Sequence, residues 1–241
     1  MLIAGARVLV TGGARRLGRA LALGLGERGA QVAFTYHRSV ADAEVTTAAL
    51  TAIGAGGHAL AADLSDGNEA RQAVEQAAAA LGGLDVLVHA ASGGFVPTDP
   101  MDVDPELFAA AIGATLTGGF FCAQAARREM GDEGVIVFIT DVAVLEAWPL
   151  FAPHAAAKAA LAQLTRSLAR AFAPEVRVCA VAPGPVLLPE GSDAARRERQ
   201  TARTALGRLG APEDVVGAVA FLIEAGYVTG EQLVVDGGHA L

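Results

Sequence analysis

The chain has 241 residues, of which 53% are hydrophobic and 18% are charged. This composition is too apolar for a disordered chain and supplies the core of one large domain or two small ones. There are 26 acidic and 18 basic residues, a net charge of −8, and no basic run, so we expect neither a nucleic-acid partner nor an anionic membrane partner. Because the chain lacks a run of about 18 consecutive apolar residues and a signal-peptide layout, we predict a cytoplasmic protein without a membrane span.

The two cysteines, Cys122 and Cys179, lie in apolar segments and do not have the spacing of metal ligands. We therefore expect two buried thiols in a reducing compartment rather than a disulfide, and no metal site. The basic residues are almost all arginine, and Lys158 is the only lysine. A single lysine in such a composition is a candidate for a specific role.

Short apolar runs rich in β-branched residues alternate along the chain with stretches of helical periodicity. The runs predict seven strands, at residues 8–11, 31–36, 58–61, 86–88, 135–139, 176–181 and 232–235. The stretches between them predict helices at residues 17–28, 41–53, 69–81, 105–130, 151–172, 194–204 and 212–224. Short strands that are apolar on both faces and joined by helices are typical of a parallel sheet covered on both sides. We predict an α/β fold, a single doubly wound, Rossmann-type domain over residues 1–241.

Such folds bind ligands outside the carboxyl ends of their strands, so the residues that follow each strand are the first candidates for a site. The first strand ends in TGGARRLG, residues 11–18, which opens a helix. Glycines allow a tight turn and a close approach of the backbone to a pyrophosphate, and the helix start offers free N–H groups. This context predicts a dinucleotide-binding turn, and the alternative is an ordinary turn between strand and helix.

The end of the second strand, residues 36–39, lacks the carboxylate that an NAD-selective site places near the ribose 2′-hydroxyl. It offers Arg38 instead, and the first turn offers Arg16. Guanidinium groups suit a 2′-phosphate, which favours NADP(H) over NAD(H) unless both arginines are merely solvated. Asp63 follows the third strand, where it borders an adenine or caps the next helix.

The chain resembles a short-chain dehydrogenase/reductase over essentially its whole length, in the turn at residues 11–18, Asp63-Leu64, Asp85, Lys158, Pro183-Gly184 and the ending at residues 230–238. Arg16 stands where the family usually has glycine, and Asp141 stands where most relatives have a catalytic serine. Together with residues 36–39, these two features are similar to the pteridine reductase branch, which depends on NADPH. Phe95 lies near the position where that branch stacks an aromatic ring on the pterin.

The resemblance implies a catalytic tyrosine, which gives a proton to the substrate, and a lysine four residues further on, which lowers the tyrosine pKa and holds the nicotinamide ribose. The lysine is Lys158, but the tyrosine position holds His154. An imidazole with a pKa of about 6.5 suits proton donation near neutral pH. Asp141 favours its charged form and Lys158 disfavours it. We predict Asp141, His154 and Lys158 as the catalytic residues.

Two further positions depart from the family pattern. The Asn-Asn-Ala-Gly stretch after the fourth strand reads HAAS, residues 89–92, and the asparagine of the following helix is Thr115. We interpret His89 as structural, and His37, His58 and His239 as surface or loop residues, although the resemblance places His37 beside the cofactor.

The resemblance also implies a cofactor site and a lid. NADP(H) is expected to contact Thr11, Gly12, Arg16, Leu17, Gly18, His37, Arg38, Asp63, Leu64, Ala90, Lys158, Pro183, Gly184 and Val186. A lid over the substrate is expected at residues 186–208, and Phe95 is the expected substrate contact. The arginines of this lid face either an acidic tail of the substrate or, as such runs more often do, solvent.

These observations favour an NADPH-dependent oxidoreductase that reduces a small carbonyl or imine substrate, with a dihydropterin as one candidate. The first alternative is a 3-oxoacyl thioester or general ketone reductase. The second is a non-catalytic NADP(H)-binding sensor or scaffold subunit, which would not depend on His154. The family resemblance further implies a homo-oligomer, commonly a tetramer.

Overall fold

Seven parallel strands form one sheet in the computed structural model, which describes residues 1–189 and 191–241. The strands are β1 (Arg7–Thr11), β2 (Gln31–Tyr36), β3 (Gly56–Ala61), β4 (Val86–His89), β5 (Gly134–Ile139), β6 (Val176–Pro183) and β7 (Gln232–Val235). Their order is β3-β2-β1-β4-β5-β6-β7. The chain order of the strands reverses between β1 and β4, so loops diverge there and leave a crevice at the carboxyl ends. The predicted doubly wound α/β fold is confirmed.

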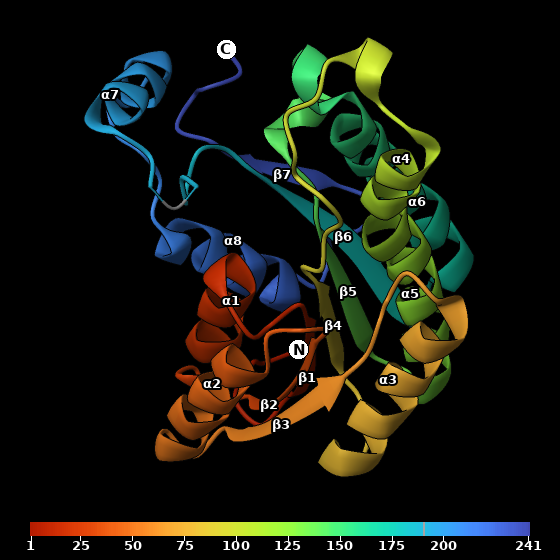
Figure 1. The fold of residues 1–241 in the computed structure, drawn as a ribbon. Coiled ribbons are helices and arrows are strands. Elements are labelled where there is room, and N and C mark those ends of the chain that lie inside the picture. Colours follow the sequence, from red (N-terminus) through yellow and green to blue (C-terminus); the bar gives the residue numbers. More distant parts are fainter. Residues whose placement is uncertain (190) are drawn as a thin grey trace.

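Helices cover both faces of the sheet (Figure 1). On one face lie α1 (Arg16–Gly26), α2 (Val40–Ala52) and α8 (Pro212–Glu224). On the other lie α3 (Gly67–Leu81), α4 (Pro105–Ile112), α5 (Gly118–Glu129) and α6 (Ala152–Phe172). Helix α7 (Ala194–Arg203) stands apart from both layers, above the carboxyl ends of the strands.

Each central strand divides its side chains between two cores. Val8 and Val10 of β1 pack under α1, α2 and α8, whereas Leu9 packs on the opposite side. All three are fully buried, because a parallel sheet between two helix layers leaves neither face in water. At the other end of β1, the Arg7 Nε donates to Asp85 at 2.8 Å. Asp85, one of the residues of the family resemblance, therefore fixes the ends of β1 and β4 far from the crevice.

The predicted helix over residues 105–130 is interrupted by a π turn at Gly113–Thr117, which divides it into α4 and α5. The helix packs closely against the loop after β3 at this turn. A Cβ on Gly113 would lie 2.7 Å from the Ser65 Cβ, and one on Gly118 would lie 2.7 Å from the Leu64 carbonyl oxygen. The predicted helical region over residues 105–130 is confirmed, because the chain stays helical from Pro105 to Glu129, and only the π turn within it was not predicted.

The stretch Pro105–Glu129 is long and apolar enough to cross a membrane by length and composition, with a mean hydropathy of 1.4 over its most apolar window. The sequence prediction considered only uninterrupted apolar runs and did not identify this stretch. Here α5 packs against α3, and α4 packs against α6. A core helix passes the same test, so this stretch is weak evidence for a membrane.

Both cysteines are buried and free, as expected. Burial raises the pKa of the Cys122 thiol to about 12, so the thiol stays protonated and unreactive at neutral pH.

Candidate active site

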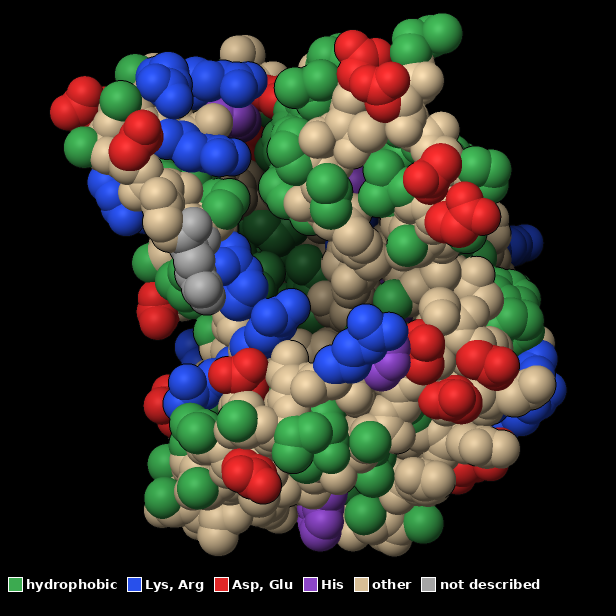
Figure 2. All heavy atoms as spheres, in the orientation of Figure 1, with side chains coloured by type: hydrophobic (Ala, Val, Ile, Leu, Met, Phe, Trp, Pro, Cys, Tyr) green, Lys and Arg blue, Asp and Glu red, His purple; other side chains and the backbone are tan. Residues whose placement is uncertain are grey.

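A cavity of about 560 Å³ opens at the carboxyl ends of β1, β4, β5 and β6. Figure 2 shows it as a hollow with hydrophobic side chains on its floor and Lys or Arg side chains along its left and lower rims. Its lining includes many of the predicted site residues, namely Arg16, Leu17, Ala90, Phe95, Asp141, His154, Lys158, Pro183, Gly184 and Val186. The fold therefore gathers these residues from five separate segments around one space.

The three predicted catalytic residues lie together at the floor of this cavity. Asp141 follows β5, and one of its carboxylate oxygens, Oδ1, accepts the Ala143 N–H at 2.9 Å. Its other oxygen, Oδ2, lies 3.4 Å from Nε2 of His154, which is buried in the first turn of α6. Lys158 lies one turn further on the same helix face, because residues four apart share a face. A paired carboxylate and imidazole and a nearby ammonium thus line the same cavity.

Lys158 is the most constrained member of this group. Its side chain is 4% exposed, and its Nζ donates to the Ile139 carbonyl oxygen at 2.7 Å. Burial lowers the pKa of Lys158 to about 8, although the charge of Asp141 opposes the shift. The ammonium therefore predominates at pH 7 and is lost as the pH rises through about 8.

Aromatic rings form one wall of the cavity. Phe95, from the loop after β4, stacks on Phe151 with ring centroids 4.2 Å apart and meets the His154 ring edge-on at 4.9 Å. Trp148 approaches both phenylalanines at 6.4 and 6.1 Å. Phe95 remains 45% exposed, so its ring is available to a ligand beside His154. A flat or apolar ligand would find dispersion contacts here.

The glycine-rich turn has no side chains at the positions where its backbone packs most closely. Gly12 has a φ of +65°, and a Cβ on it would lie 3.0 Å from the Ala91 Cα. A Cβ on Gly18 would lie 2.1 Å from the Gly12 carbonyl oxygen. Side chains are therefore excluded where the turn opens α1, and the arrangement fits the pyrophosphate of a dinucleotide.

Arg16 takes the left-handed conformation that favours glycine, with a φ of +51°. Its Nη2 donates to the Leu187 carbonyl oxygen at 2.9 Å, so the guanidinium links the first turn to the segment after β6. Among the described residues, its other guanidinium nitrogens have no hydrogen-bond partner, so this exposed side chain has donors for a ligand. Arg16 is therefore both a lining residue and a connection between two parts of the site.

Thr11, predicted to contact the cofactor, uses its hydroxyl within the protein. The oxygen accepts the N–H groups of Ala90 and Ala91, both at 3.1 Å, and lies 2.8 Å from His89 Nδ1. On the other side of the ring, Nε2 lies 3.1 Å from the Thr115 carbonyl oxygen, an acceptor, so Nε2 carries the proton and Nδ1 accepts from Thr11. These bonds confirm the structural interpretation of His89 and leave the Thr11 hydroxyl no spare capacity.

His89 predicts a dependence of stability on pH. Burial lowers the pKa of this fully buried ring to about 4, whereas an unfolded histidine titrates near 6.5. Between these values the unfolded state binds more protons, so stability is full above pH 6.5 and falls as the pH drops toward 4. Over this pH range, the free energy of unfolding is expected to fall by on the order of 3 kcal/mol. We expect urea unfolding from pH 7 to 4 to show this slope.

Two variants separate His89 from other titrating groups. His89→Asn is expected to be less stable at pH 7 and to lose most of the slope, because an amide does not titrate. His58→Asn, which alters an exposed histidine on β3, is expected to keep the slope. An unchanged slope in His89→Asn would assign the pH dependence to other residues.

The ends of β2 and β3 carry His37, Arg38 and Asp63 at the adjacent part of the crevice. His37 and Arg38 are exposed, and His37 Nε2 lies 3.7 Å from the Asp63 carboxylate. Asp63 accepts from the Ser65 hydroxyl at 2.7 Å, which holds the pKa of that carboxyl below its usual value. Asp66, not Asp63, caps α3, so the capping alternative for Asp63 was wrong. The Leu64 side chain is buried in the core, and only its backbone remains for a ligand.

The segment after β6 closes the opposite side of the cavity. Pro183 is buried, and a Cβ on Gly184 would lie 2.6 Å from the Asp236 Cβ, so the backbone there packs tightly against the C-terminal segment. Val186 lines the cavity. Helix α7 follows, with Asp193 capping it by accepting the Arg196 N–H at 2.7 Å. Residues 186–189 and 191–208 thus place loop segments and α7 beside the cavity, and residue 190 of the expected lid lies outside the described residues.

A second group of residues was not predicted. Glu146 accepts the Trp148 indole N–H at 2.6 Å and the Arg203 guanidinium at 3.1 Å, and its carboxylate lies 3.8 Å from His239 Nε2. His239 is 6% exposed and lies in the turn after β7, so the expectation of a loop position is confirmed and that of a surface position was wrong. These residues come from three distant segments, and no local sequence pattern indicates their contact.

The chain was compared with known proteins. The family model for Enoyl-(Acyl carrier protein) reductase matches residues 12–240. L-rhamnose 1-dehydrogenase (NAD(P)(+)) from Azotobacter vinelandii is 35% identical over 99% of this chain and 98% of its own. The 3-oxoacyl-[acyl-carrier-protein] reductase FabG from Staphylococcus aureus is 33% identical over 95% of this chain and 96% of its own.

Solved structures agree with these relatives. A short chain dehydrogenase from Burkholderia cenocepacia J2315 in complex with NADP superposes with a TM-score of 0.93 at 33% identity, covering all of both chains. A short-chain dehydrogenase/reductase from Serratia marcescens BCRC 10948 reaches a TM-score of 0.94 at 33% identity, also over both whole chains. The sheet order, the glycine-rich turn and these matches agree: the chain belongs to the short-chain dehydrogenase/reductase family of oxidoreductases.

Proposed function

We propose that the protein is an NADPH-dependent reductase of a carbonyl or imine substrate that carries a flat or apolar body. The observation that carries the proposal is the grouping of Asp141, His154 and Lys158 on the floor of an aromatic-walled cavity beside the glycine-rich turn. The relative solved with NADP and a similar structure solved with NADPH support the choice of cofactor. In the reaction, a hydride and a proton add across the C=O or C=N bond, and NADPH becomes NADP⁺.

The cofactor site is assigned from the residues that line the crevice. The bare turn at Gly12 and Gly18 would hold the pyrophosphate, and Lys158 the nicotinamide ribose, while Arg16 and Arg38 would meet the 2′-phosphate. The remaining contacts are proposed at Thr11, through its backbone, and at Leu17, His37, Asp63, Leu64, Ala90, Pro183, Gly184 and Val186. NADPH supplies the hydride when it is bound.

We assign the proton to the His154–Asp141 pair. The Asp141 carboxylate lies 3.4 Å from Nε2 of the ring and can orient it, and the buried ring is held edge-on against Phe95. A protonated ring can donate to the substrate atom that gains negative charge as the hydride arrives. His154 would thus take the part of the tyrosine that the family places here. Lys158 would keep a positive charge within the same site.

Two substrate classes fit this geometry. A dihydropterin matches the position of Phe95 and the presence of Arg16 and Asp141, as in the pteridine reductase branch. A ketone or 3-oxoacyl thioester is the second candidate, and the likeness to FabG favours it. A non-catalytic NADP(H)-binding sensor is the remaining alternative, and it requires that His154 be dispensable.

The first test follows NADPH absorbance with a dihydropterin and with an aromatic ketone. The His154→Phe variant is expected to lose at least tenfold in turnover, about 1.4 kcal/mol of barrier, because phenylalanine fills the space but carries no proton. Equal turnover by both proteins would contradict the role of His154 and move the proton source to Asp141 or water. Cofactor binding without oxidation of any acceptor would favour the sensor.

We also propose a homo-oligomer, with a tetramer favoured by the family resemblance. Phe108 on α4 and Phe120 on α5 are 48% and 36% exposed, and Leu233 and Val234 lie half-exposed on the edge strand β7. Exposed apolar side chains on helices and on a sheet edge are typical of surfaces that pair with other subunits. The cytoplasmic location stays a prediction.

A further inference from the structure

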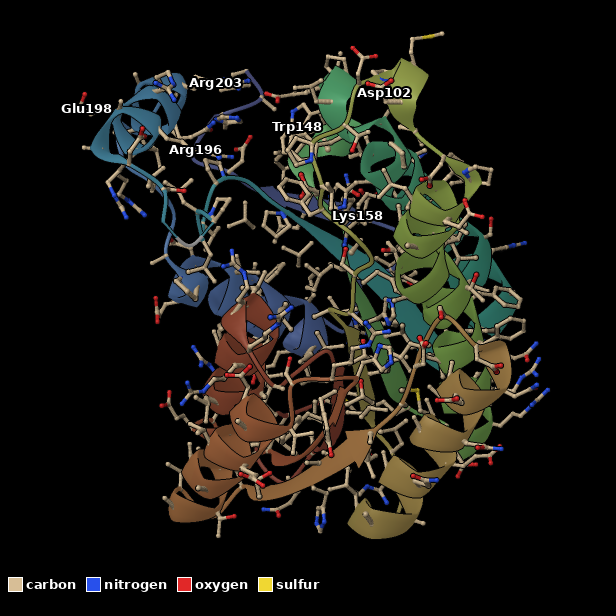
Figure 3. All side chains as sticks on the ribbon, viewed as in Figure 1. Asp102, Trp148, Lys158, Arg196, Glu198 and Arg203 are labelled. Atoms are coloured by element: carbon tan, nitrogen blue, oxygen red, sulfur yellow. The ribbon has the colours of Figure 1, made fainter. Side chains whose placement is uncertain are left out.

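One face of α7 is turned toward the cavity. Arg196, Gln200 and Arg203 line the cavity, and their spacing of four and three residues places them on a single helix face. Arg196 and Gln200 are half-buried, whereas Arg197 and Arg199 are exposed. In Figure 3, Arg196 and Arg203 lie on the side of α7 that faces Trp148, and Glu198 lies on the opposite side. The arginines of this segment therefore divide into a cavity face and a solvent face.

The two arginines of α7 that line the cavity differ in their partners. The Arg203 guanidinium donates to both oxygens of Glu146, at 3.1 and 3.2 Å, so its charge is compensated. Within residues 1–189 and 191–241, no carboxylate lies within 4 Å of the Arg196 guanidinium. Among the described residues, Arg196 is thus the α7 arginine of this cavity that has no acidic partner, and its guanidinium is directed at the cavity rather than at a carboxylate.

His239 adds a second observation at the same end. Its side chain lines the cavity and is 94% buried, because only 6% of it is exposed. Among the described residues, its Nδ1 has no hydrogen-bond partner. A buried polar atom without a partner costs free energy unless a ligand or water pairs with it. Arg196, Gln200 and His239 therefore offer a guanidinium, an amide and an imidazole to a polar group in the cavity.

We infer that this end of the cavity is a carboxylate subsite, in which Arg196 binds an anionic substituent of the substrate while the reacting carbon lies at His154. The inference rests on the proposed function and names its substrate class: a carbonyl or imine compound with a flat apolar body and a carboxylate. A planar guanidinium matches a carboxylate in a two-point geometry. A carboxylate brings one negative charge to Arg196, whereas a phosphate would bring a second negative charge into the end of the cavity where Glu146 already pairs with Arg203.

The test uses 4-carboxybenzaldehyde, its homologues with one to three methylene groups before the carboxylate, and the methyl ester of each. Wild-type protein is expected to prefer at least one carboxylate over its ester by tenfold or more in kcat/KM. Arg196→Gln is expected to lower kcat/KM for that carboxylate at least tenfold, mainly through KM, and for the ester less than threefold. Arg196→Lys should recover part of the loss. Arg199→Gln, on the solvent face, is the matched control and should change neither value.

A binding measurement separates this inference from the proposed function. Titration of the protein–NADP⁺ complex with benzoate and its homologues needs no turnover, and Arg196→Gln is expected to weaken binding at least fivefold. If no aldehyde or ester oxidises NADPH, the proposed function fails, and this titration still decides the inference. Turnover without preference for a carboxylate, or equal binding by wild type and Arg196→Gln, would overturn the carboxylate subsite.

Discussion

A Lys158→Met variant is expected to lose about 100-fold or more in kcat/KM for NADPH-dependent reduction, a barrier increase of about 2.7 kcal/mol. Methionine matches the length of the lysine stem but removes the ammonium, whose Nζ donates to the Ile139 carbonyl oxygen at 2.7 Å. The loss leaves that buried carbonyl without its partner and removes the positive charge next to Asp141 and His154. Because the same group is proposed to hold the nicotinamide ribose, we expect KM for NADPH to rise as well as kcat to fall.

The dependence of activity on pH tests the role of the Lys158 ammonium independently of the substitution. Its pKa of about 8 means that the ammonium is present below that pH and absent above it. Wild-type kcat/KM is therefore expected to decline above pH 8, and this limb should disappear in Lys158→Met. Arg166→Met, two turns further along α6 on an exposed position, controls for the loss of a basic residue from the helix. A Lys158→Met protein within threefold of wild type would remove Lys158 from the proposed mechanism.

The fold could be predicted closely because its signals are local. Strands β2 and β7 begin and end where the apolar runs predicted, and α8 begins at Pro212 as expected for a proline in a first turn. Each buried strand lies between two helix layers, so nearly all of its residues are apolar and the strand is visible in the sequence as an apolar run. The π turn at residues 113–117 could not be predicted, because periodicity does not distinguish a π turn from an α-helix and the close packing of Gly113 against Ser65 involves a distant loop.

Part of the site could be predicted because some of its residues belong to short local motifs. Asp141, His154 and Lys158 follow from family motifs, and the structure brings them into one cavity. Glu146 and His239 were missed, although both lie beside that cavity. Glu146 has no motif of its own, and its role depends on Arg203, which is 57 residues away. For residues in loops without periodicity, the sequence does not indicate which distant residues they contact.

The structure also shows how the cofactor turn and the substrate side are connected. Arg16 lies in the first turn, adopts a left-handed φ and donates to the carbonyl of Leu187. The segment that holds Leu187 continues into α7, which carries Arg196. The left-handed backbone conformation at this position is less favourable for arginine than for glycine. The hydrogen bond to the segment after β6 offsets that cost, which gives the residue a function that glycine does not have.

A Gly18→Ala variant is expected to raise the dissociation constant for NADPH at least tenfold. The added Cβ would lie 2.1 Å from the Gly12 carbonyl oxygen and 2.8 Å from the Gly12 carbonyl carbon, both backbone atoms of the same turn. Neither atom can move as a flexible side chain would, so the turn must open and α1 must shift away from it. The N–H groups at the start of α1 then no longer converge on one point, which weakens their attraction for a pyrophosphate. Titration of NADPH fluorescence measures the effect directly.

Gly217→Ala provides the matched control for this substitution. Gly217 lies on α8, is exposed, and a Cβ on it would meet no atom within 4 Å. Alanine there favours the helix by about 0.5 to 1 kcal/mol and should leave NADPH affinity unchanged. A Gly18→Ala protein that unfolds like wild type yet binds NADPH poorly would locate the defect in the turn. Unchanged NADPH affinity in that protein would mean that the pyrophosphate does not lie at residues 12–18, and the cofactor site would have to be placed elsewhere along the crevice.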